Sequence, residues 1–396
     1  MAGSNTTLEP YDIVRVPVIV QFREEAAFTE TYGFTGSQGS VFLEGQRIIP
    51  QDLPSDTVLV FMHPASTLHL MPLPVALAKA GFHVLSCASR YARNDTALIM
   101  EKVCADLGAY IRYAREELGY RNVVLCGWSG GGSLAVFYQS QAEHPSITQT
   151  PAGDVYDLTR ANLPPADAVM FIAAHTGRAR ILSEWIDPSV MDESNPDIRD
   201  TAFDLYAENG PKPPYDADFV VEFRERQIAR MRRITDTVLE QLAHLKRVGG
   251  AEIERPFIVH RTMADPRFLD PTQEPNERRP GWSYLGNPET VNTGPVGLAR
   301  FSTLRAWLSQ WSPNHSRADA EECVGHIACP LLLIENGADD AVPPSHPACV
   351  FEAGKMADKT YLRVDGATHY YREQPEKQAE VIREIRAWLK ERLLLR

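Results

Sequence analysis

The chain has 396 residues, of which 44% are hydrophobic, and it carries a formal net charge of −12 at pH 7. This length is enough for one large globular domain with an insertion, or for two smaller domains. The negative charge argues against nucleic acid and anionic membranes as main partners, because both select basic surfaces. No apolar run approaches the length of a membrane span, so we expect no membrane partner.

The cysteines and the first residues indicate the compartment. Six cysteines are dispersed through the chain without paired spacing, so we interpret them as free thiols in a reducing environment. Residues 1–10 lack a basic flank followed by an apolar core, and we therefore expect no signal peptide. Together these features predict a cytoplasmic protein. The oligomeric state stays open, a homo-oligomer included.

Strands and helices alternate over much of the chain. Residues 14–22 and 40–49 are predicted to form an antiparallel edge, because Pro17 lacks a ladder donor. Buried strands are predicted over 57–63, 83–88, 123–128, 166–174, 330–335 and 360–364. Helices are predicted over 73–80, 97–118, 133–138, 301–311 and 375–394. This alternation predicts an α/β fold with a mainly parallel, doubly wound sheet flanked by helices, whose ligands bind at the carboxyl ends of the strands.

The alternation stops between about 176 and 298, where loops surround one amphipathic helix with an apolar stripe from Val220 to Leu245. We interpret 1–175 and 299–396 as two parts of one core, and 176–298 as a mostly helical cap or lid. Arginines fill much of the rest of that helix, and a solvated face is favoured for them over an anion site. They are Arg224, Arg226, Arg230, Arg232 and Arg233.

A serine among glycines follows one of the buried strands, in the stretch Gly127-Trp128-Ser129-Gly130-Gly131. A sharp strand-to-helix turn needs glycines at these positions, since strand and helix approach closely there. The alternative is a Gly-rich turn that only caps a helix. Further along, Asp339 and Asp340 follow one strand and His369 follows the last, giving the chain order Ser, Asp, His.

The G-x-S-x-G pattern and this order resemble the α/β-hydrolase superfamily, over residues 55–175 and 325–396. The resemblance implies a nucleophile Ser129, a general base His369 and an acid. Asp340 matches the acid position better than Asp339, because it lies three residues after Gly337 and two before Val342. The resemblance also implies an oxyanion hole formed by the N–H groups of Gly130 and of the loop after His63. Pro64 has no N–H, so Ala65 is the second candidate and Ser66 the next.

Several aromatic residues are candidates to contact a substrate. His63 and Trp128 lie beside the expected site, although a role in fixing the loop and packing beside the serine is favoured for them. His175 ends a strand and could line the pocket. The cap contributes Trp185 and Trp282, and the segment after it contributes Trp307. A cap rich in such residues predicts a largely apolar pocket.

No motif for a bound cofactor or metal is present in the sequence: H-E-x-x-H, the dinucleotide fingerprint and the P-loop lysine are all missing. We therefore expect no cofactor, and a small-molecule substrate as partner. The resemblance implies a serine hydrolase that cleaves a carboxylic ester, a lactone or a thioester of a bulky apolar or aromatic molecule through an acyl-enzyme. The alternatives are a carbon-carbon bond hydrolase of ring-fission products, an acyltransferase, and a non-catalytic binding protein of the same fold.

Overall fold

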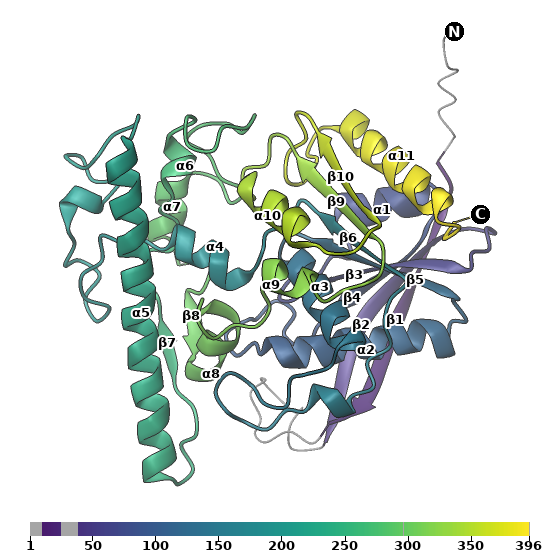
Figure 1. The fold of residues 1–396 in the computed structure, drawn as a ribbon, viewed down its shortest axis with the longest axis horizontal. Coiled ribbons are helices and arrows are strands. Elements are labelled where there is room, and N and C mark those ends of the chain that lie inside the picture. The colour runs from purple at the N-terminus through teal and green to yellow at the C-terminus, as the bar shows by residue number, and fades with distance from the viewer. Residues whose placement is uncertain (1–9, 25–38, 296, 396) are drawn as a thin grey trace.

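An eight-stranded sheet forms the centre of the computed structural model, which describes residues 10–24, 39–295 and 297–395 (Figure 1). Its strands lie in the order β1-β2-β4-β3-β5-β6-β9-β10. They are β1 (Ile13–Arg23), β2 (Ser40–Pro50), β3 (Thr57–His63), β4 (His83–Ala88), β5 (Asn122–Trp128), β6 (Ala168–Ile172), β9 (Leu331–Asn336) and β10 (Lys359–Val364). β2 runs antiparallel to β1 and β4. The other neighbouring strands of this sheet, from β4 through β3, β5, β6 and β9 to β10, pair in parallel. The predicted doubly wound sheet is thus confirmed.

Helices cover both faces of the sheet, which explains the continuous apolar runs in the central strands. Alternate residues of β3 face opposite cores: Val58 and Val60 belong to one, Leu59 and Phe61 to the other. α2 (Met100–Glu116), α3 (Gly130–Glu143), α9 (Ala320–Val324) and α10 (Ser345–Ala353) cover the first face. α1 (Pro72–Lys79) and α11 (Pro375–Glu391) cover the second.

The predicted antiparallel edge is also present. β1 pairs with β2 along its whole length, with Pro17 opposite Gln46, and within the described residues it has no second partner. A strand with one free side tolerates the missing N–H of proline. All six cysteines are free, and no helix in the described ranges is long and apolar enough to cross a membrane.

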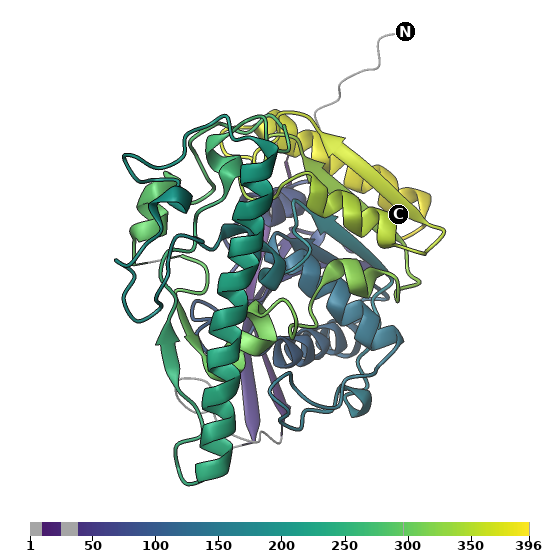
Figure 2. The same cartoon turned by 60° about the vertical axis from the view of Figure 1, so that its left-hand side comes forward.

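The segment between β6 and β9, which we call the insertion, contains a group of helices to one side of the sheet (Figures 1 and 2). Before α9 it holds α4 (Arg178–Trp185), η2 (Thr201–Phe203), α5 (Ala217–Val248), β7 (Pro256–Ile258), α6 (Pro266–Leu269), α7 (Pro288–Thr293), β8 (Phe301–Thr303), α8 (Leu304–Ala306) and η3 (Trp307–Trp311). A short 3-10 helix η1 (Leu158–Arg160) precedes β6. The apolar stripe of α5 packs on Trp307 and Trp311, so this segment has a core of its own. Residues 301–311 were predicted to be helical throughout, but 301–303 form β8, which pairs with β7.

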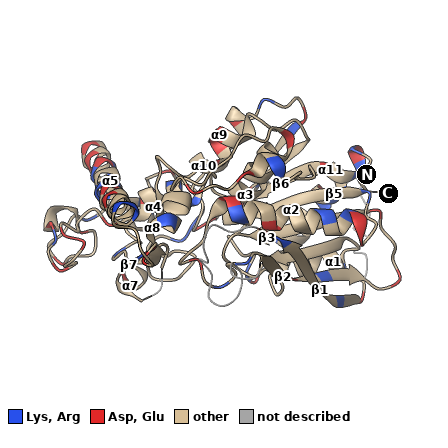
Figure 3. Ribbon diagram, turned by 90° about the horizontal axis from the view of Figure 1, so that it is seen from below, with Lys and Arg blue, Asp and Glu red and all other residues tan. Residues whose placement is uncertain are grey.

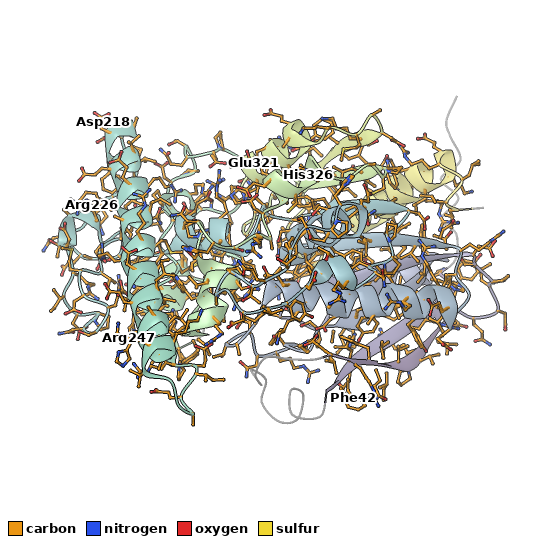
Figure 4. All side chains as sticks on the ribbon, turned by 60° about the horizontal axis from the view of Figure 1, so that its bottom comes forward. Phe42, Asp218, Arg226, Arg247, Glu321 and His326 are labelled. Carbon is orange, nitrogen blue, oxygen red and sulfur yellow. The ribbon has the colours of Figure 1, made fainter. Side chains whose placement is uncertain are left out.

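Charges of both signs run along α5 (Figures 3 and 4), but its arginines are not simply a solvated face. Arg230 is fully buried, where it pairs with Glu193 and donates to three backbone carbonyls. Arg224 donates to Asp265 at 2.8 Å, and the guanidinium of Arg226 lies 3.8 Å from the centre of the Phe203 ring. The prediction of a solvated face is therefore wrong for the buried Arg230, whereas Arg232 and Arg233 are exposed as predicted. Arg224, Arg226 and Arg230 attach α5 to the segments around it.

Candidate active site

Ser129 occupies the tight turn between β5 and α3, with the positive φ of 54° that marks a strained backbone. The strand and the helix approach so closely that a Cβ on Gly127 would lie 2.4 Å from the carbonyl oxygen of Gly131. A Cβ on Gly132 would lie 2.4 Å from the Cβ of Ala174. The glycines are therefore required by contact, and they hold the half-buried Ser129 at the carboxyl end of the sheet.

His369 lies beside this turn, in the loop after β10. Its ring packs on the indole of Trp128 with 4.6 Å between centroids, and the Trp128 Nε1–H donates to the His369 carbonyl at 3.2 Å. Nδ1 of His369 lies 2.9 Å from Oδ2 of Asp339. Nε2 is buried and has no hydrogen-bond partner within the described chain. The imidazole is thus held from one side and free on the other.

The structure corrects the aspartate predicted to contact this histidine. Asp339 is buried, and its Oδ1 accepts the N–H groups of Ala341 and Val342, both at 2.8 Å, which turns Oδ2 toward His369. Asp340, the predicted residue, is half-buried and lines a hollow beside the histidine instead. Loss of hydration, with the nearby negative charge of Asp339, raises the pKa of Asp340 to about 6.

Of the two predicted oxyanion donors, only one is available. Gly130 is the first residue of α3, where backbone N–H groups have no acceptor within the helix. The N–H of Ala65, however, donates to Nδ1 of His63 at 3.1 Å, and the N–H of Ser66 donates to the same atom at 3.0 Å. The prediction that Ala65 faces the site is therefore wrong, and the alternative Ser66 is excluded for the same reason. His63 fixes this loop, as favoured from the sequence.

The predicted tryptophans separate into two groups. Trp128 packs against the rings of both His369 and Tyr370, and Trp282 lines the hollow beside His369. Trp185 is buried behind Tyr284, with 5.7 Å between ring centroids. Trp307 is fully buried in the core of the insertion, where Nε1 donates to Thr235 at 2.9 Å, so its predicted place in the pocket is wrong.

The hollow beside His369 has a volume of about 460 Å³ and a mixed lining. Trp282, Tyr284 and Tyr370 supply aromatic surface, as expected for an apolar pocket. Charged groups line it as well, and these were not expected: they are Glu277, Arg279, Asp340, Arg372 and Glu373. A second hollow, of about 340 Å³, is lined by Trp128 and Tyr370 among other residues.

Sequence reasoning missed two tyrosines that contact the histidine ring. Tyr370 and Tyr284 lie with their ring centroids 5.0 and 5.9 Å from that of His369, both edge to face. Tyr370 directly follows His369, so its position was a usable signal. Tyr284 belongs to a loop of the insertion without periodicity, and no feature of the sequence marked it.

The strand order, the antiparallel edge at β1 and β2, and the serine turn after β5 define the fold. The chain has the α/β-hydrolase fold, as its motifs implied. No protein-family model and no curated protein matches it.

Several solved structures are similar to this chain. The structure of DcsB in complex with its substrate analogue matches with a TM-score of 0.50 at 12% identity, covering 95% of this chain and 99% of that one. Brefeldin A esterase, described as a bacterial homologue of human hormone sensitive lipase, gives 0.46 at 12% identity, over 97% and 78% of the two chains. Siderophore hydrolase EstB from Aspergillus fumigatus gives 0.46 at 13% identity, over 88% and 94%. At 12% identity the likeness to the DcsB structure concerns the fold alone.

Proposed function

We propose that this protein is a serine hydrolase that cleaves a carboxylic ester through an acyl-enzyme, with Ser129, His369 and Asp339 as its catalytic residues. The observation that supports the proposal is the buried Asp339–His369 pair. The His369 ring packs on Trp128, the residue before the strained Ser129, and its Nε2 has no hydrogen-bond partner among the described residues. A serine hydroxyl is a poor nucleophile at neutral pH and needs an oriented base beside it. Among the described side chains around Ser129, His369 has both an orienting carboxylate and an unpartnered nitrogen.

In the proposed reaction, Ser129 Oγ attacks the ester carbonyl carbon while His369 Nε2 takes the hydroxyl proton. Asp339 holds the other ring nitrogen and stabilises the imidazolium that forms. The Gly130 N–H donates to the negative charge that develops on the carbonyl oxygen. When the tetrahedral intermediate collapses, the alcohol leaves with the proton from His369, and Ser129 keeps the acyl group. Water, deprotonated by His369, then attacks the acyl carbon. The acid is released as the bond to Ser129 Oγ breaks, and Oγ takes the proton back from His369.

We infer a substrate with a bulky aromatic or apolar part, bound against Trp282, Tyr284 and Tyr370. Tyr284 and Trp282 come from the insertion, so this segment would act as the cap that shapes specificity. The charged groups in the same lining favour a substrate that also carries a polar group. A lactone or thioester would pass through the same steps.

Steady-state hydrolysis of a panel of aryl, alkyl, lactone and thioester substrates tests this function. We expect turnover of at least one ester class, loss of activity in Ser129→Ala and in His369→Ala, and release of free acid as product. An alcohol acceptor added at high concentration distinguishes an acyltransferase, which would form the new ester in preference to the acid. Turnover that persists in Ser129→Ala would contradict the proposed mechanism.

A further inference from the structure

The loop after β3 is arranged around the ring of His63. The backbone amides of Ala65 and Ser66 both donate to Nδ1, at 3.1 and 3.0 Å. Neighbouring segments fix the carbonyls of the same loop: the hydroxyl of Ser89 donates to the Pro64 carbonyl at 2.5 Å, and the N–H of Arg93 donates to the Ala65 carbonyl at 2.7 Å. The loop therefore turns its amides to the imidazole and not into the site.

These contacts determine where the ring carries its proton. A nitrogen that accepts two N–H donors cannot itself be protonated, so the neutral ring of His63 carries its hydrogen on Nε2. Loss of hydration lowers the pKa of His63 to about 3, and the positive charges of Arg178 and of protonated His369 act in the same direction. The imidazole thus stays neutral, and its Nε2–H remains a donor, at every pH near neutrality.

This N–H lies beside the serine turn, and no described residue accepts a hydrogen bond from it. A Cβ placed on Gly130 would be 2.8 Å from Nε2 of His63, and Nε2 has no hydrogen-bond partner among the residues that the structure describes. His175 approaches the same point, with its Nε2 at 3.5 Å. Its Nδ1, however, is buried without a partner in the described chain, so no hydrogen bond of that atom fixes which nitrogen carries the proton.

We propose that the Nε2–H of His63 is the second donor of the oxyanion hole, acting together with the N–H of Gly130. The N–H groups of Ala65 and Ser66, which a backbone oxyanion hole would use, donate to Nδ1 of His63. The Nε2–H of the same ring then donates to the substrate in their place. A neutral donor suits this task, because it stabilises the oxyanion without competing with His369 for the serine proton. The proposal rests on the serine hydrolase function proposed above.

Two substitutions of His63, by Asn and by Gln, test the acceptor role of Nδ1 and the donor role of Nε2 separately. In His63→Asn the side-chain oxygen lies as many bonds from Cα as Nδ1 does, so it can still accept from Ala65 and Ser66, but no donor reaches the Nε2 position. In His63→Gln the amide nitrogen can occupy the place of Nε2 and donate. We expect kcat of His63→Asn to fall about 10²- to 10³-fold, the usual cost of one oxyanion donor, while KM and Tm change little. His63→Gln should recover at least tenfold of that loss.

A reversible trifluoromethyl ketone should lose affinity for His63→Asn by a similar factor, because its tetrahedral adduct places an oxyanion in the same site. In ¹⁵N NMR of the wild-type protein, His63 should carry its proton on Nε2, and this nitrogen should shift when the adduct forms. Wild-type kcat in His63→Asn, equal losses in the Asn and Gln variants, or a proton on Nδ1 would each overturn the proposal.

Fluorophosphonate labelling of the wild type and of Ser129→Ala keeps the two failures apart. Labelling that requires Ser129, combined with full activity in His63→Asn, would overturn the role of His63 alone. Labelling that persists without Ser129 would overturn the proposed function and this inference with it.

Discussion

The choice between Asp339 and Asp340 gives the sharpest test of the site, because the same substitution can be made at adjacent positions. In Asp339→Asn the amide oxygen can still accept the N–H groups of Ala341 and Val342, which keeps the turn intact. The amide nitrogen then faces Nδ1 of His369 and donates to it. This forces the ring proton onto Nε2, the atom that must accept the proton of Ser129.

We therefore expect kcat/KM of Asp339→Asn to fall about 10³- to 10⁴-fold, which corresponds to about 4 to 5.5 kcal/mol of transition-state stabilisation. Asp340→Asn is the matched control, and its loss should stay below about tenfold, because this carboxylate lines the hollow and has no hydrogen bond to His369. The assay is ester hydrolysis by both variants at several pH values, with Tm measured alongside. A larger loss in Asp340→Asn than in Asp339→Asn would refute the reasoning.

Three further predictions concern stability and the insertion. The raised pKa of Asp340 means that the folded protein binds the proton of this carboxyl more tightly than the unfolded chain does, so the group reduces stability as pH rises from about 4 to 6. Asp340→Asn should therefore raise Tm at pH 7 and leave it unchanged at pH 3.5, and an equal change of Tm at both pH values would count against this. Trp307→Ala should lower the free energy of unfolding by about 3 to 5 kcal/mol, measured by urea denaturation, whereas Trp282→Ala should raise KM at unchanged Tm. The reverse pattern would show that Trp307, and not Trp282, lines the hollow. Arg230→Met should destabilise the protein by about 3 to 5 kcal/mol because it leaves Glu193 and three carbonyls without their donor, while the exposed Arg232→Met should stay within about 0.5 kcal/mol.

The fold could be predicted because its signals are local. Each central strand is a continuous apolar run that ends at a polar loop, and the glycines around Ser129 meet a contact between neighbouring elements of the chain. The same periodicity misled us at Arg230, since it assigns that side chain to the polar face of α5. The guanidinium of Arg230 donates five hydrogen bonds, to Glu193 and to three backbone carbonyls. The loops that hold these acceptors and cover this face of α5 lie 30 or more residues away in the sequence.

The remaining features of the site depend on where individual side chains point, which the residue types alone do not determine. Asp339 and Asp340 are chemically identical, and only the hydrogen bonds to Ala341 and Val342 decide which carboxylate faces His369. The sequence showed that Pro64 has no N–H to donate. It did not show that the N–H of Ala65 donates to Nδ1 of His63. Tyr284 reaches His369 from a loop of the insertion, and its place follows from tertiary packing alone.

Covalent labelling with a fluorophosphonate, read by intact mass and peptide mapping, tests the central claim most directly. We predict that the wild type gains one adduct, that the adduct maps to Ser129, and that labelling is lost in Ser129→Ala and strongly slowed in His369→Ala and Asp339→Asn. A folded wild-type protein that takes up no label, or that is labelled at another residue, would contradict the assignment of Ser129 as the activated nucleophile.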